Sequence, residues 1–115
     1  MMWNIHNKPT YASINISASG NTTLVPAVAG STPFVMAMAI TVSADTNITL
    51  SFTSVALGTD QVAFFKLKAN QTMALSALDY TSGEPYYEGR PGQSFVINSS
   101  ATADVTGTIT YAYNE

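Results

Sequence analysis

The sequence has few charged residues. Its 115 residues include four Lys or Arg and seven Asp or Glu, so that 10% of the side chains are charged, against about 25% in an average globular domain. General acid–base and nucleophilic catalysis need titratable side chains in environments that tune their pKa. Because so few of these side chains are available, the sequence predicts a protein that is not an enzyme.

Cysteine, clustered basic residues and long apolar runs are also missing. The absence of cysteine excludes disulfides and thiolate metal sites. The basic residues are Lys8, Lys66, Lys68 and Arg90, and the net charge is −3, which argues against direct binding of nucleic acid. The longest apolar run covers residues 34–40 and is far shorter than the roughly 18 residues of a membrane span. We therefore expect no nucleic-acid or membrane partner.

The N-terminal residues lack the basic start followed by an apolar segment that marks a secretory signal. We expect synthesis and folding in a cytoplasm. The length fits one domain, and the first strand pattern begins near residue 13. The sequence therefore predicts an N-terminal arm at residues 1–12 and a single domain at residues 13–115.

What the sequence does contain is period-two alternation of apolar residues with Ser, Thr and Asn, which is typical of half-buried strands. Turn residues separate about eight such segments, most of them at roughly 8–12-residue spacing. The expected strands are residues 13–17, 22–28, 34–42, 48–53, 61–68, 73–77, 95–97 and 105–113, with a loop at 55–60 and an irregular segment at 80–92. The predicted fold is all-β, an antiparallel β-sandwich of jelly-roll type.

The alternation also predicts the core, because every second residue of a half-buried strand faces inward. The expected core residues are Ile14, Ile16, Leu24, Met36, Met38, Ile40, Ile48, Leu50, Phe52, Phe65, Leu67, Leu75, Phe95, Ile97, Val105 and Ile109.

Side chains that could carry chemistry are few and scattered. His6 is the only histidine, so a Ser-His-Asp arrangement would have to use it; its polar setting favours a solvated arm residue. Glu84 and Glu88 could form a glycosidase pair or a calcium site, but no Asp-rich loop accompanies them, and a solvated loop is the favoured interpretation. We expect no catalytic residue, no cofactor and no metal.

Aromatic residues gather in the irregular segment at residues 80–92. Tyr80, Tyr86 and Tyr87 lie there beside Arg90. Tyr and Arg are favoured in protein interfaces, exposed Tyr can stack on sugars, and a Tyr ring can also cap the end of a sandwich. The sequence leaves these three interpretations open.

Several segments together resemble a known group of proteins. Residues 18–30, ASGNTTLVPAVAG, are similar to the small-Gly-Asn-Thr-Leu-Val-x-Ala-Val-Ala-Gly opening of small structural proteins of tailed phages, with one extra Thr. The Pro-Tyr-Tyr-Glu segment at 85–88 and the Val-x-Gly-x-Ile-x-Tyr strand at 105–111 follow in the order found in that group. The resemblance covers roughly residues 14–113 and points to jelly-roll head decoration (cement) proteins.

This resemblance implies a virion structural protein on the exterior of a capsid. It implies that the major capsid protein is the partner, that contacts between capsid subunits are reinforced, and that the chain acts as a homotrimer. The alternative is a receptor- or glycan-binding sandwich module of a head or tail fibre. The candidate protein-interface residues are Trp3, Ile5 and His6 in the arm, and Tyr80, Tyr86, Tyr87 and Arg90 in the irregular segment.

Overall fold

The protein is an all-β sandwich. The computed structural model describes residues 9–76 and 85–114, and these contain nine strands and no helix. The strands are β1 (Thr10–Ile16), β2 (Gly20–Val25), β3 (Thr32–Val42), β4 (Thr46–Ser54), β5 (Gly58–Leu67), β6 (Thr72–Ser76), β7 (Tyr87–Glu88), β8 (Ser94–Ser99) and β9 (Val105–Asn114).

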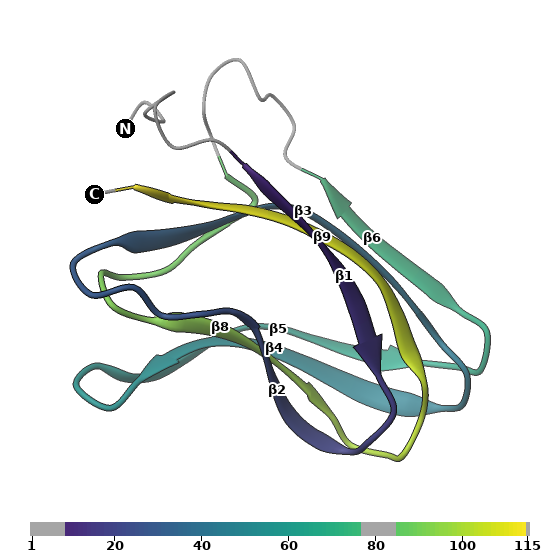
Figure 1. Ribbon diagram of the computed structural model, residues 1–115. Helices are drawn as coiled ribbons and strands as arrows, with labels where there is room; N and C mark the ends of the chain where they lie inside the picture. The colour runs from purple at the N-terminus through teal and green to yellow at the C-terminus, as the bar shows by residue number, and fades with distance from the viewer. Residues whose placement is uncertain (1–8, 77–84, 115) are drawn as a thin grey trace.

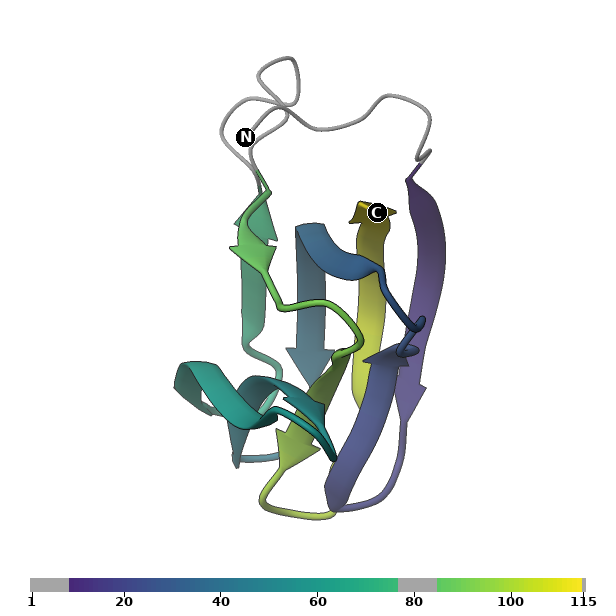
Figure 2. The same cartoon turned by 90° about the vertical axis from the view of Figure 1, so that its left-hand side faces the viewer.

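The strands form two antiparallel sheets that pack face to face (Figure 1). Sheet A has the order β1-β9-β3-β6, with the short β7 paired to β3, and sheet B has the order β2-β8-β4-β5. Apart from β7, each sheet has four strands, and most connections pass from one sheet to the other. This strand order is that of a jelly roll, and the predicted fold is confirmed. The hairpin of β4 and β5 projects at one side of the molecule (Figure 2, teal).

The core lies between the inner faces of the two sheets. Most of the expected core residues are buried there, among them Ile40 of β3, Leu50 and Phe52 of β4, and Ile109 of β9. The prediction was wrong in degree for three residues, because Leu24, Phe65 and Leu75 are only partly buried against the core.

Two β-bulges explain where the predicted alternation loses its phase, in β2 and near the start of β3. A bulge inserts one residue and so reverses the inward and outward alternation beyond it. The bulge between Thr23 and Val25 places Val25 in the core with an exposed fraction of 0%, in the position expected for Leu24. A second bulge between Val35 and Ala37 turns Val35 inward. Met36 is buried as expected, but with Phe34 in a separate cluster rather than in the main core.

The strand boundaries also differ from the expected ones. β5 begins at Gly58, so Asp60 lies in a strand opposite Phe52 and not in a loop. β2 ends at Val25 rather than at residue 28, and the irregular segment contains the two-residue strand β7. β1 begins at Thr10, which places the last part of the predicted arm in the edge strand of sheet A. The shifted starts of β1 and β5 have a common cause: pairing with a neighbouring strand extends a strand beyond its apolar alternation.

Candidate functional site

The structure describes three of the seven candidate interface residues. Tyr86, Tyr87 and Arg90 lie in or beside β7, at one end of the sandwich. The other four are Trp3, Ile5, His6 and Tyr80, and they lie outside the described residues.

Tyr86 and Tyr87 take different positions although they are neighbours. Tyr87 pairs with Val35 in sheet A, and its ring lies 6.3 Å from that of Phe95 in the core. Burial, with a smaller contribution from Tyr86, raises the pKa of Tyr87. The ring of Tyr86 lies edge-on to Tyr87 at 4.9 Å, and the residue is 43% exposed. Tyr87 therefore caps the core, and Tyr86 presents part of its ring to solvent.

Arg90 is held in a network of hydrogen bonds. Its Nε and Nη2 atoms donate to Oδ2 of Asp60 at 3.1 and 2.7 Å, and Nη2 also donates to the Leu57 carbonyl at 3.1 Å. Nε2 of the fully buried Gln93 donates to the same Asp60 oxygen at 3.0 Å. The side chain of Arg90 therefore ties the β4–β5 turn to the segment that leads into β8. About half of it is still exposed.

The Asp60 network predicts a dependence of stability on pH. Hydrogen bonds from Gln93, and then from Arg90, hold the pKa of Asp60 below its usual 3.8. A carboxylate with a lowered pKa stabilises the fold above its unfolded pKa, and this contribution is lost as the pH falls through the folded pKa. In Asp60→Asn, we expect the denaturant midpoint to fall less than in the wild type between about pH 5 and about pH 2.

Urea titrations at several pH values measure this difference. Asp104→Asn, at an exposed position outside the network, is the matched control and is expected to follow the wild-type profile. Parallel profiles for the wild type and Asp60→Asn would contradict the role given to Asp60.

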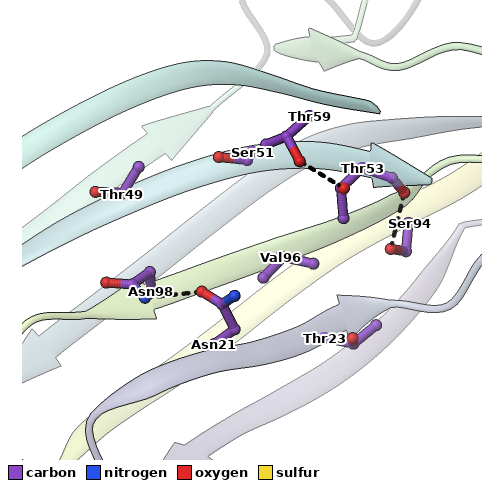
Figure 3. Close-up of a pocket in the computed structure, with 9 residues that line it drawn as sticks. All are labelled: Asn21, Thr23, Thr49, Ser51, Thr53, Thr59, Ser94, Val96 and Asn98. Atoms are coloured by element: carbon purple, nitrogen blue, oxygen red, sulfur yellow. Dashed lines mark hydrogen bonds between the residues drawn. The ribbon is translucent and has the colours of Figure 1, made fainter. Parts of the chain in front are cut away.

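The outer face of sheet B is hollowed into a groove of about 270 Å³ (Figure 3). Its lining comes from four strands: Asn21 and Thr23 of β2, Ser94, Val96 and Asn98 of β8, Thr49, Ser51 and Thr53 of β4, and Thr59 of β5. None of these side chains is charged. The sheet register arranges them in rows across the strands, and the middle row is Thr23, Val96 and Ser51. We call this feature the sheet B groove.

Hydrogen bonds fix the two ends of the sheet B groove. At one end Nδ2 of Asn98 donates to Oδ1 of Asn21 at 2.7 Å. At the other end the hydroxyls of Thr53 and Thr59 lie 2.7 Å apart, and the Ser94 hydroxyl donates to the Thr53 carbonyl. Three hydroxyls of the lining have no protein partner in the described part of the chain: those of Thr23 and Ser51 in the middle row, and that of Thr49 in the row of Asn98. The groove thus has hydrogen-bonded side chains at both ends, and free hydroxyls for a ligand at its centre and beside Asn98.

Comparisons of the chain with protein-family models, with curated proteins and with solved structures give no match.

The described residues show no grouping of three or more His, Cys, Asp or Glu side chains that could hold a metal ion. In the same residues, no helix is long and apolar enough to cross a membrane.

The sheet B groove was missed by the sequence interpretation. The alternation of residues 47–54 correctly placed Thr49, Ser51 and Thr53 on the outer face of a strand, but strands distant in the sequence supply the other residues of the groove. The sequence signal for the groove was the composition of the outer face of β4, where every side chain carries a hydroxyl or an amide group.

Proposed function

We propose that the protein is a virion structural protein that decorates the exterior of a phage capsid and binds across the joints between major capsid protein subunits. The resemblance of residues 14–113 to head decoration proteins is one support. The structural observation that carries the proposal is the composition of sheet A. Its four main strands, β1, β9, β3 and β6, contain no Asp, Glu, Lys or Arg.

The outer face of sheet A presents small uncharged side chains in register. One row across the sheet consists of Ser13, Thr108, Ala39 and Ala74. Hydroxyl and methyl groups cost less to remove from water than charges do, and charged residues are depleted at the centres of protein interfaces. Tyr11, in the edge strand β1, is 78% exposed and adds an aromatic side chain of the kind enriched in interfaces. This face therefore suits packing on a protein shell.

In the proposed assembly the chain bridges capsid subunits, so that the particle cannot expand or lose a subunit without breaking the added contacts. A homotrimer with closed cyclic symmetry fits such a position. Light scattering is then expected to give about three times the chain mass of 12.2 kDa.

A charge placed on the outer face of sheet A tests the proposal. Thr108 is exposed in the middle of this face, and we expect Thr108→Arg to fold normally but to lose at least tenfold in affinity for capsids, because the guanidinium must be desolvated without a partner. The measurement is co-sedimentation of the recombinant protein with heads that lack it. Ala56→Arg, at the exposed tip of the β4–β5 hairpin, is the control and is expected to bind like the wild type.

Equal binding of the two variants would exclude this face, and absence of the chain from purified virions would exclude the proposed function. The partly exposed ring of Tyr86 favours one alternative, a receptor- or glycan-binding module of a head or tail fibre. Recovery of the chain in fibre fractions rather than with the capsid shell would favour that alternative.

A further inference from the structure

The sheet B groove has the chemistry of a site for an uncharged small ligand. The lining carries no cation that would hold a phosphate or a carboxylate, and no carboxylate that would hold a metal ion or an amine. What it offers are hydroxyls and side-chain amides, each of which can both donate and accept hydrogen bonds. A ligand that forms hydrogen bonds with all of these groups must itself carry several uncharged groups that donate and accept hydrogen bonds.

The Asn21–Asn98 end of the groove keeps unused hydrogen-bonding capacity. The bond between Asn98 and Asn21 uses one donor hydrogen of Asn98 and one lone pair of Asn21. The oxygen of Asn98 and the amide nitrogen of Asn21 are therefore free to bind a ligand. Together with the hydroxyls of Thr23, Thr49 and Ser51, they line the hollow from both sides (Figure 3).

Apolar groups interrupt this polar lining. Val96 lies in the middle row between Thr23 and Ser51. Phe64 pairs with Thr49 and therefore shares its face of the sheet, and it is 49% exposed at the border of the groove. A methyl-lined floor beside an exposed ring suits a ligand that has an apolar C–H face as well as hydroxyl groups.

The position of the groove excludes an added peptide strand. Most of its lining lies on β8 and β4, which are inner strands of sheet B with neighbours on both sides. Their backbone groups are already used in the sheet, so strand addition, which needs a free edge, is not available there. The volume of about 270 Å³ lies just below the usual range for small-molecule sites, which limits the ligand to about one or two sugar rings.

From these observations we infer that the sheet B groove binds a neutral saccharide. Hydroxyls of the sugar bond to Thr49, Ser51 and Asn98, and the C–H face of a ring packs on Val96. This site is separate from the uncharged face of sheet A proposed to contact the capsid, because the two lie on opposite outer faces of the sandwich. The protein would then bind a shell through one sheet and surface glycans through the other.

The test is an NMR titration of the isolated, isotope-labelled protein with glucose, galactose, mannose, N-acetylglucosamine and their neutral disaccharides. For so open a site we expect a dissociation constant on the order of 1 mM for at least one sugar. The changes in backbone amide chemical shift that this sugar causes in the protein should centre on Ser51, Val96 and Asn98. N-acetylneuraminic acid, which carries a charge, is expected to bind at least tenfold more weakly.

Matched variants separate a specific site from general weak contact. The double variant Thr49→Val, Ser51→Ala removes two unpartnered hydroxyls with little change of volume, and we expect it to bind at least tenfold more weakly. Thr108→Val, which removes a hydroxyl from the outer face of sheet A, is the control and should bind like the wild type. An equal loss in both variants, or no shift in the groove at about 50 mM of any of these sugars, overturns the inference. Neither result bears on capsid attachment, because the titration contains no capsid.

Discussion

Gly107→Ala is expected to destabilise the protein by about 3 kcal/mol or more, toward the upper end of what overpacking costs. Gly107 lies in the middle of β9, between Ile14 of β1 and Ile40 of β3. A Cβ atom at this position would overlap the carbonyl oxygen of Ala39, and it would lie 2.9 Å from Cα of Ile40. These are backbone atoms of the neighbouring strand, so no side chain can rotate to make room.

Thermal unfolding followed by circular dichroism measures the effect. For a domain of this size a loss of about 3 kcal/mol lowers the Tm by roughly 10 °C or more. Thr108→Ala changes the next residue on the exposed face of β9 and is expected to cost less than about 1 kcal/mol. Gly58→Ala tests the other role of glycine, because Gly58 has a φ of 78° and nothing within 4 Å of an added Cβ. It is expected to cost about 1–2 kcal/mol, the penalty of the left-handed conformation.

A Gly107→Ala variant as stable as Thr108→Ala would contradict the close approach of β9 to β3. It would mean that β9 and β3 can move apart at this position at little cost in free energy.

The sequence predicted the architecture because the apolar alternation survives in most strands. Residues 48–53 alternate without interruption, and the burial of Ile48, Leu50 and Phe52 follows that pattern in β4. The alternation failed where a bulge changes the phase, as at Val25 and at Val35. A bulge depends on how the partner strand pairs, and the partner of β2 is β8, which is far away in the sequence.

The apolar alternation also could not predict which polar residues are buried. Gln93 is fully buried, yet nothing in its local sequence distinguishes it from a solvated loop residue. Its burial depends on Asp60, which accepts a bond from its Nε2, and on the backbone of Arg90, which donates to its Oε1. The guanidinium of Arg90, a candidate interface residue, bonds to the same Asp60 carboxylate and to the Leu57 carbonyl. A pattern of single strands cannot show a network that joins a hairpin to a distant loop.

The candidate surfaces were predictable to different degrees. The shortage of charge pointed to uncharged outer faces, and sheet A has this composition along all four main strands. The sheet B groove depends on the register of four strands, which sets Thr23, Val96 and Ser51 in one row. Composition therefore indicated the kind of surface, and only the pairing of the strands located the hollow.

The second large effect is expected for Phe52 in the core. Phe52 is 1% exposed, its ring lies 4.9 Å from that of Phe95, and the backbone of Gly89 packs directly on it. Phe52→Ala removes the ring from a site that the surrounding strands cannot close, so we expect a loss of about 3–5 kcal/mol in the free energy of unfolding. Phe52→Asp places an unpaired carboxylate in the same site and is expected to abolish folding.

Phe64→Ala provides the matched control, because it removes the same ring from the neighbouring strand of the same sheet. Phe64 is 49% exposed on the outer face, and we expect its removal to cost no more than about 1 kcal/mol. Urea denaturation of the two alanine variants measures the difference directly. The midpoint of Phe52→Ala should fall far below that of Phe64→Ala, and similar midpoints would mean that Phe52 and Phe95 do not form the centre of the core.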